Sequence, residues 1–460
     1  MSFDCLAYPE SCLFFLIGFV ALVFASIFKK NLFSPPLLYV LVQSIMFGIA
    51  YLKLMPAMTD YHLTTWLVWG GGAFSFLTGC FLVRLAFCSS NPSLVLPQKL
   101  SIAVEYNWKY HFFLSFTALA FFLYGVLGVV SIAGNLVLLT DNPSLWLDGK
   151  TSSVLNYAFF FTSSPMVVAL FGVASFKSYN PIRWIRNASR IICLSTIILS
   201  FLTFPSRGVN LMCVGFLFVL ANYLFKRINW KTAAVIVAFV LLFFVSVASV
   251  KGQYGEMEVT DNRVFKEVAL LPYKYIANNY WNLDYAFNRT SDVPEHSWTY
   301  GIDAFYGITQ LMSIGTGLQA SFGWDSPFNE SIEKVSGLNT IPYLWDAYKD
   351  FGYPGIFLVP FFWGFIFTFL YKKMPMAKTP LALLFHITFT FWIILWNFTT
   401  GYKQAMYVIW FIFFFFVCMV SYRKKMLLPA NQIVSKEVCP ENNSNHEIAS
   451  EREDRNCGAC

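Results

Sequence analysis

The stretch from Leu338 to Gly355 reads LNTIPYLWDAYKDFGYPG, and it holds three tyrosines, a tryptophan, two aspartates and a lysine. It leads directly into a strongly apolar run, IFLVPFFWGFIFTFLY, over residues 356–371. Such a run is typical of a membrane helix, because about 20 mostly apolar residues span the hydrocarbon core of a bilayer. Gly352 can adopt a positive φ, and Pro354 suits the first turn of a helix because it needs no amide hydrogen. The stretch therefore predicts a turn over Tyr348–Gly355 that feeds a membrane helix.

The whole chain has the same apolar character. Of its 460 residues, 57% are hydrophobic, 19% are aromatic and only 12% are charged, whereas a soluble domain carries about 25% charged residues. We therefore expect an all-α polytopic membrane protein with about eleven transmembrane helices. The expected helices occupy the apolar runs 12–28, 36–52, 64–83, 111–133, 154–176, 190–204, 208–225, 232–250, 355–371, 379–398 and 404–421. These helices form a membrane domain over residues 1–428, and the polar tail at 429–460 is expected to be disordered and cytoplasmic.

The basic residues predict the orientation of this domain. Lys29 and Lys30 follow the first apolar run, which places the N-terminus outside under the positive-inside rule. With eleven spans, the segments expected inside carry eighteen lysines and arginines, and the short outer segments carry four. The net charge of +7 is therefore explained by topology and by attraction to anionic lipids. No basic-aromatic pattern indicates a nucleic-acid partner.

One large segment interrupts the apolar pattern. Residues 251–353 lie between the eighth and ninth expected helices, and by topology they face the outside. Within them, Phe265–Ala286 predicts short helices lying at the membrane interface, interrupted at Pro272. The segment carries seven basic and thirteen acidic residues, so any phosphate site in it must be local. It is the one expected outer surface large enough for chemistry.

Arg207 lies in the sequence FPSRGVN, between two apolar runs that are too long together for one bilayer crossing. The chain is therefore expected to turn near Pro205–Gly208, which puts an arginine at the outer mouth of a tight hairpin. The guanidinium could extend to lipid phosphates. It could equally bind an anionic substrate, since its planar fork suits pyrophosphate oxygens.

Other candidate residues lie in the outer segment. Arg263 is placed to supply a second cation, and Lys274 and Arg289 are further cations in the same half. A proton acceptor could come from several acidic residues or a histidine, of which Asp346 is our choice; the candidates are Glu256, Asp261, His296, Asp346 and Asp350. Aromatic residues such as Tyr348 could bind substrate or simply anchor the chain at the interface. No metal-ligand spacing occurs, and neither a metal nor a cofactor is expected.

Two motifs resemble those of a known family. The Ser-Arg-Gly turn at Ser206–Gly208, and the Asn-Thr, Tyr, Asp-Phe-Gly and Gly pattern of the stretch at 338–355, resemble the bacterial O-antigen polymerases, the Wzy-type oligosaccharide repeat-unit polymerases. The layout, with many spans and a large late outer loop, is also similar. The resemblance implies a GT-C-like glycosyltransferase of the bacterial inner membrane, with a periplasmic N-terminus and a cytoplasmic C-terminus.

The resemblance also implies a reaction. Oligosaccharide repeat units linked through pyrophosphate to undecaprenol would be joined at the periplasmic face, with release of undecaprenyl pyrophosphate. Arg207 and Arg263 would then stabilise the leaving group and Asp346 would accept a proton. Lys274, Arg289, Tyr348 and Asp350 would contact substrate. The structural turns would be formed by Gly208, Gly352 and Pro354.

The resemblance makes membrane lipids, a chain-length regulator and a flippase the expected partners. Two other functions stay open. An O-antigen ligase would use the same kind of donor with a different acceptor. A flippase or other transporter of lipid-linked oligosaccharides would also explain many spans and an arginine at the membrane, although the single long outer segment disfavours it.

Overall fold

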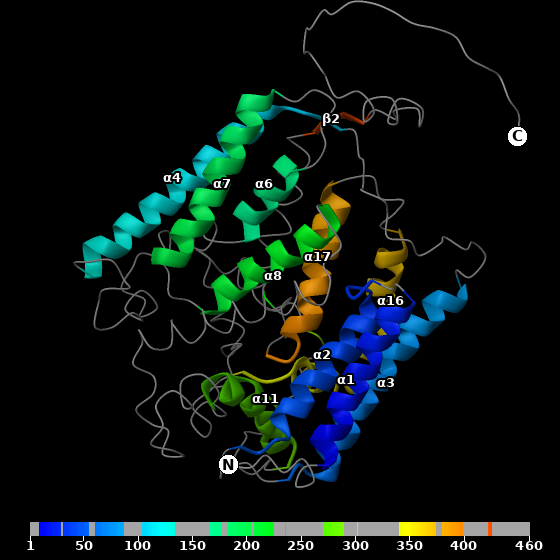
Figure 1. Ribbon diagram of the computed structural model, residues 1–460. Coiled ribbons are helices and arrows are strands. Elements are labelled where there is room, and N and C mark those ends of the chain that lie inside the picture. Colours follow the sequence, from blue (N-terminus) through cyan, green and yellow to red (C-terminus); the bar gives the residue numbers. More distant parts are fainter. Residues whose placement is uncertain are drawn as a thin grey trace, which may run out of the picture.

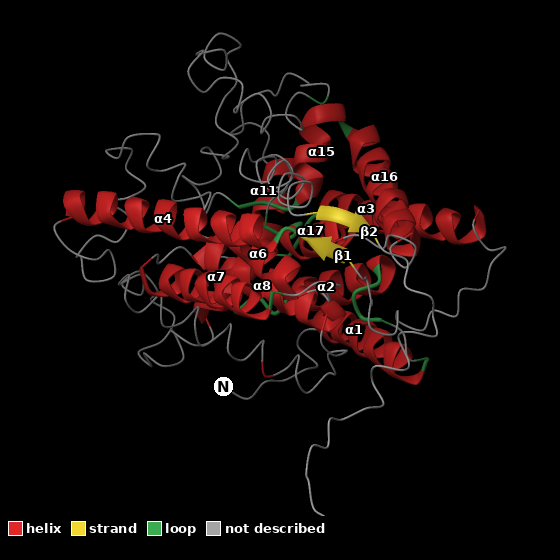
Figure 2. Ribbon diagram, turned by 90° about the horizontal axis from the view of Figure 1, so that it is seen from above, coloured by secondary structure: helices red, strands yellow, loops and turns green. Residues whose placement is uncertain are grey.

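The computed structural model describes residues 9–28, 31–54, 60–86, 104–133, 165–175, 182–203, 207–224, 235, 270–288, 301, 340–373, 380–398 and 422–425. Helices make up nearly all of this part of the chain (Figure 1). The helices are α1 (Pro9–Ile27), α2 (Pro35–Ala50), α3 (Leu63–Ala86), α4 (Trp108–Ala133), α6 (Pro165–Ser175), α7 (Arg183–Thr203), α8 (Arg207–Leu224), α11 (Leu271–Asn288), α15 (Tyr343–Phe351), α16 (Tyr353–Lys373) and α17 (Pro380–Leu395). Two short strands, β1 (Val104–Tyr106) and β2 (Tyr422–Lys425), form an antiparallel pair (Figure 2).

Four of the described helices, α1, α3, α4 and α16, are long and apolar enough to cross a membrane. Shorter apolar helices occur within α2, α8 and α17. Many large apolar side chains on the long helices face outward, including Phe19 on α1, Phe74 on α3 and Phe362 on α16. An apolar surface of this extent is unfavourable in water and suits contact with lipid. The structure is therefore that of a helical membrane protein.

Nine of the eleven expected apolar runs coincide, in whole or in part, with described helices. Runs 36–52, 208–225, 355–371 and 379–398 begin and end within a few residues of α2, α8, α16 and α17. α6 covers the second half of the run at 154–176, whose first half lies outside the described residues, and α7 begins seven residues before the run at 190–204. The runs at 232–250 and 404–421 lie outside the described helices, as does the tail at 429–460.

α3 and α16 lie side by side and approach each other closely. A Cβ atom added at Gly79 would collide with the backbone of Phe361, and one added at Gly364 would collide with the carbonyl oxygen of Phe76. The thiol of Cys80 also donates to the carbonyl oxygen of Gly364 at 3.4 Å. Small residues that let two backbones approach are a common basis of helix association in membranes.

Most of the described helices belong to one of two groups, seen together in Figures 1 and 2. α1, α2, α3 and α16 form one group, and α4, α6, α7 and α8 form the other. α17 contacts both groups, through α2 and α16 on one side and α8 on the other. Trp396 near the end of α17 is fully buried, where it stacks on Tyr343 and Phe367. The main apolar core therefore runs through α17.

Residue contacts show the direction of each helix. α3 and α16 run parallel, because Gly71 lies beside Phe357 and the Lys372 ammonium reaches the Val83 carbonyl oxygen. α17 runs the other way, since His386 contacts Tyr371 and Trp396 contacts Tyr343.

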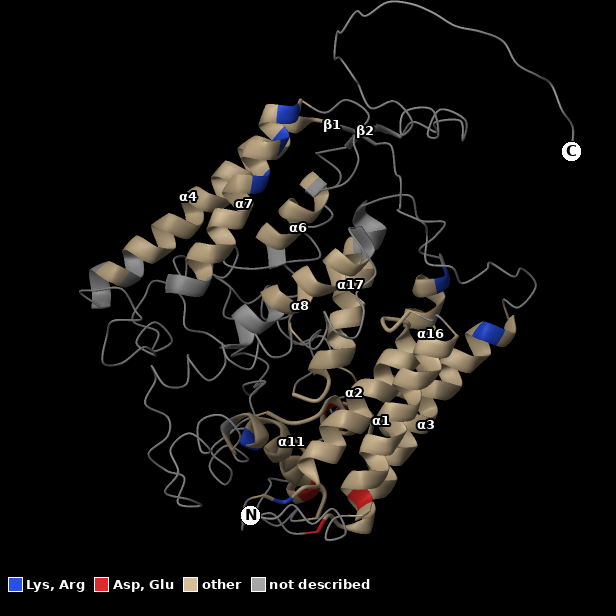
Figure 3. Cartoon of the chain, viewed as in Figure 1, with Lys and Arg blue, Asp and Glu red and all other residues tan. Residues whose placement is uncertain are grey.

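Because the helices run in these directions, basic and acidic side chains lie at opposite ends of the helices (Figure 3). We call one end the basic end, because it holds several arginines and lysines of α3, α4, α7 and α16, namely Arg84, Lys109, Arg183, Arg186, Arg190 and Lys372. The opposite end is the acidic end, where the described acidic side chains lie, namely Glu10, Asp60, Asp284, Asp346 and Asp350. This end also holds three lysines: Lys53 pairs with Asp60, Lys349 lies beside Asp346, and Lys274 belongs to α11 (Leu271–Asn288).

The structure differs from several sequence expectations. Tyr348–Phe351 is helical, so the turn before α16 consists of Gly352 alone. Pro272 is the second residue of α11, where its missing amide hydrogen costs nothing, and α11 then continues to Asn288 as one helix; residues 265–269 of the predicted short helices lie outside the described residues. Gly208 is the second residue of α8 and is therefore not part of a turn. The pairing of β1 with β2 also adds a small sheet to a fold expected to be all-α.

Candidate functional site

The helix α11 lies at the acidic end. Its sequence is rich in asparagine and tyrosine, yet nearly every side chain from Ala277 to Phe287 is buried. Buried polar groups are costly unless they are hydrogen-bonded, so a buried polar helix is informative. The Tyr280 hydroxyl reaches the side chains of Gln43 on α2 and Asn397 after α17. The Asn282 amide donates to the Thr340 carbonyl oxygen at 2.8 Å.

α15 lies next to α11 and is built from the stretch at 338–355. Pro342 precedes the helix, and Asp346 in the first turn and Lys349 in the last turn agree with the helix dipole. The backbone amide of Tyr343 donates to the Trp396 carbonyl oxygen at 3.0 Å, which ties this stretch to the end of α17. Gly352 then turns the chain with φ 65° and ψ −152°, a conformation that is essentially confined to glycine.

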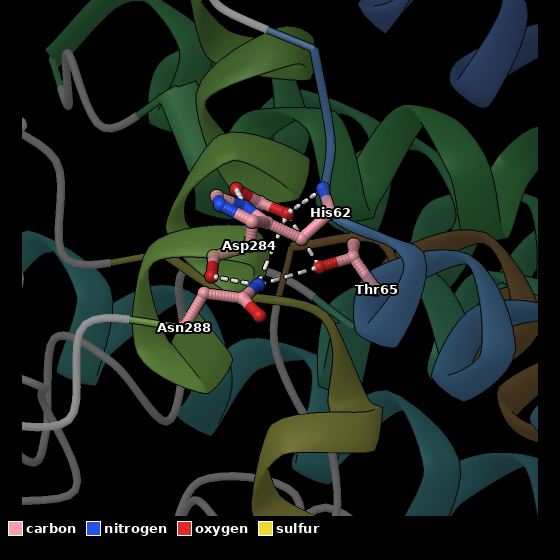
Figure 4. Close-up of polar contacts among 4 residues, drawn as sticks. All are labelled: His62, Thr65, Asp284 and Asn288. Atoms are coloured by element: carbon pink, nitrogen blue, oxygen red, sulfur yellow. Dashed lines mark hydrogen bonds and ion pairs between the residues drawn. The ribbon is translucent and has the colours of Figure 1, made fainter.

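Asp284 of α11 is the centre of a polar cluster (Figure 4). One carboxylate oxygen accepts hydrogen bonds from the His62 backbone amide at 2.8 Å, from the Thr65 hydroxyl at 2.6 Å and from the Asn288 amide at 3.2 Å. The other oxygen lies 2.9 Å from Nδ1 of the His62 ring. Three donors on one oxygen are consistent with a carboxylate that is ionised and held rigidly. The cluster also fixes the start of α3 against α11.

The His62 ring has a defined orientation in this cluster. An ionised carboxylate can only accept, so Nδ1 must carry the proton that it donates to Asp284. Nε2 is then the ring nitrogen that can accept a proton. The His62 side chain is 57% exposed, whereas that of Asp284 is only 9% exposed. A buried carboxylate that orients an accessible imidazole is an arrangement that can support general base chemistry.

Aromatic rings lie beside this pair. Phe287, one helical turn after Asp284, contacts the rings of Trp345 and Tyr348 at centroid distances of 5.4 and 4.8 Å. Trp345 and Tyr348 stack on each other, and Tyr348 also meets Tyr353, which is exposed. Burial raises the pKa of Tyr348 above its ordinary value, so its hydroxyl stays protonated. The group therefore extends from Phe287, three residues after Asp284 on α11, to the exposed ring of Tyr353.

Of the predicted site residues that the structure describes, some lie together on α15 and one lies far from them. Asp346 is buried and lies 3.4 Å from Lys349 on the same helix, and Asp350 is buried as well. Tyr348 is half-buried in the aromatic group. Lys274 lies near the other end of α11, about 20 Å along the helix from Phe287, so it does not meet Tyr348.

The structure describes little of the three predicted arginines. Arg207 is the first residue of α8, and its side chain lies outside the description. Arg263 and Arg289 lie outside the described residues altogether. Gly352 and Pro354 occupy the predicted turn and first helical turn.

Sequence reasoning missed His62 and Asp284. The two residues are 222 positions apart, and His62 belongs to a short outer segment that carried no motif. Each residue alone is unremarkable in the sequence, because only the fold places α11 across the start of α3. No pattern in the sequence would have paired them.

A cavity of about 680 Å³ lies at the sides of α1, α2 and α3. Its lining is mostly apolar, with Leu16, Val20 and Phe24 from α1, and Arg84 and Asn31 are its more polar members. This lining suits a hydrocarbon chain and offers little for chemistry on a polar substrate. The polar residues of the acidic end are therefore the better candidate site.

Comparison of the chain with family models, curated proteins and solved structures found no match in any of the three.

Proposed function

We propose that this chain is an O-antigen polymerase, a membrane glycosyltransferase that joins undecaprenyl-pyrophosphate-linked oligosaccharide repeat units at the periplasmic face of the bacterial inner membrane. The observation that carries the proposal is the site at the acidic end. Two segments of the long polar excursion, 270–288 and 340–351, meet there beside an exposed histidine and a group of aromatic rings. Aromatic faces suit sugar rings, and the neighbouring apolar helices suit a lipid-linked substrate. The motif resemblance supports the same conclusion.

The proposal includes a topology of eleven spans, with the acidic end outside. Its support is the separation of basic from acidic side chains along parallel and antiparallel helices (Figure 3). The pairing of β1 with β2 agrees with it, because the segments around 104–106 and 422–425 are both expected inside. A cytoplasmic C-terminus and a periplasmic N-terminus follow from this arrangement.

The proposed chemistry needs cations at the leaving group. We propose that Arg207 and Arg263 stabilise the charge that develops on pyrophosphate. The position of Arg207 supports this role, since it is the first residue of α8 and helix N-termini favour anions. α8 follows α7 after a short connection, so Arg207 lies toward the end of α7 that is remote from the basic end. A chain-length regulator and a flippase are the proposed partners.

The test is the lipopolysaccharide pattern of a deletion strain of the source organism. We expect single repeat units on the lipid A core in the deletion strain, and a full ladder when the gene is restored on a plasmid. Loss of every repeat unit would point instead to an O-antigen ligase or a flippase. An unchanged ladder in the deletion strain would contradict all three functions.

A further inference from the structure

His62 and Asp284 form a pair that the sequence did not single out, and they lie at the proposed site. We propose that His62 is the general base of the transfer reaction and that Asp284 is its positioning residue. This inference rests on the proposed polymerase function. It assigns the removal of the proton from the acceptor sugar to His62 in place of Asp346, the residue chosen from the sequence.

The proposed step is balanced in atoms and electrons. An acceptor hydroxyl oxygen forms a bond to the anomeric carbon of the donor sugar, and the bond from that carbon to the pyrophosphate oxygen breaks. The hydroxyl proton moves to Nε2 of His62 as the new bond forms, and the electron pair of the broken bond leaves with undecaprenyl pyrophosphate. The proton then passes from His62 to solvent, which returns the imidazole to its starting state.

Geometry favours His62 over the other described candidates at this end. The acidic side chains of α15, Asp346 and Asp350, are 5% and 2% exposed, and Asp346 lies beside Lys349. A buried carboxylate of this kind cannot reach a substrate hydroxyl without rearrangement of α15. His62 is mostly exposed, and its orientation is fixed by a hydrogen bond to a carboxylate that other donors hold in place.

The position of the pair also fits a sugar acceptor. Asp284 and Phe287 are three residues apart on α11, so about 4.5 Å of helix rise separates them. The ring of Phe287 contacts the ring of Tyr348, and the ring of Tyr348 in turn contacts the exposed ring of Tyr353. Residues three apart are neighbours on the surface of a helix, so a sugar ring that stacks on this aromatic group would lie on the side of α11 that carries Asp284.

A purely structural role is the main alternative, because Asp284 also holds the first residues of α3. Asparagine separates the two roles. In His62→Asn the side-chain amide lies where Nδ1 lies in histidine, so it can still donate to Asp284. It has no counterpart of Nε2 and cannot accept the proton. A structural role predicts normal output from this variant, and a catalytic role predicts a large loss.

The experiment restores the deletion strain with wild type, His62→Asn, Asp284→Asn and the control Asp60→Asn. Asp60 is an exposed carboxylate two residues from His62, and it pairs with Lys53 instead. Polymer is measured per unit of membrane-inserted protein. We expect His62→Asn to lower the rate by about 100- to 10,000-fold, Asp284→Asn to lower it clearly, and Asp60→Asn to remain near wild type.

A second measurement uses purified protein in detergent with lipid-linked repeat units. Free imidazole should restore part of the activity of His62→Gly and should add nothing to wild type, an effect that lost structure alone would not produce. Near-wild-type output from His62→Asn in the strain that wild type restores would overturn the role of His62 and leave the polymerase function standing. A wild-type chain that restores no polymer would overturn both.

Discussion

Single residues at the acidic end are constrained by backbone geometry as well as by chemistry. Gly352 has φ 65° and ψ −152°, outside the left-handed helical region that asparagine tolerates. We therefore expect Gly352→Ala and Gly352→Asn to destabilise the protein by similar amounts, about 1 to 3 kcal/mol. The measurement is the thermal inactivation midpoint of each purified variant. An asparagine variant as stable as wild type would show that the turn has a different backbone conformation.

The same residue shows what sequence can and cannot predict at this scale. The positive φ of Gly352 and the position of Pro354 were predicted correctly, because each follows from the chemistry of one residue. The extent of the turn was wrong. Tyr348–Phe351 became helical because α15 packs Leu344 and Ala347 into the core, and burial outweighed the local turn signal.

At the scale of helices, the contact between α3 and α16 depends on small residues. Gly364 meets the carbonyl oxygen of Phe76, which cannot move aside as a flexible side chain could. We expect Gly364→Ala to force the two helices apart and to cost about 1 to 3 kcal/mol. The thermal midpoint of the purified variant and its abundance in the membrane should both fall.

Gly70→Ala is the matched control for this prediction. Gly70 lies on α3, the other helix of this contact, but nothing lies within 4 Å of the position of an added Cβ. Alanine is favoured over glycine in a helix by about 1 kcal/mol, so this variant should be as stable as wild type or slightly more stable. Equal losses at both positions would mean that replacing a glycine is harmful in either helix and that close packing is not the cause.

Hydrophobic runs predicted most of the described helices, since each membrane helix satisfies its own backbone and must be apolar to contact lipid. α11 was harder to predict. Its mixed sequence was interpreted as interfacial, yet the helix is buried because Tyr280, Asn282 and Asp284 find partners on other elements. Such partners are distant in the sequence, so a buried polar helix cannot be distinguished locally from an exposed one. The pairing of His62 with Asp284 was unpredictable for the same reason.

At the scale of the whole molecule, topology links the fold to the proposed function. The residues of the candidate site lie at one end, and most of the basic residues that the structure describes lie at the other (Figure 3). Basic segments are retained in the cytoplasm, so the site should face the periplasm, where lipid-linked repeat units would be joined. A cytoplasmic site would be incompatible with the proposed reaction.

Reporter fusions test this arrangement directly. We expect a reporter fused after Pro429, and one inserted at 87–100 close to β1, to lie in the cytoplasm, since the pairing of β1 with β2 requires both segments on one side. A reporter inserted near Asp292, four residues after the end of α11, should lie in the periplasm. The measurement pairs alkaline phosphatase, which is active only outside, with a fluorescent protein that folds only inside. If the Asp292 reporter lay on the same side as the Pro429 reporter, α11 and its His62–Asp284 pair would face the cytoplasm, and neither the topology nor the site could serve a periplasmic polymerase.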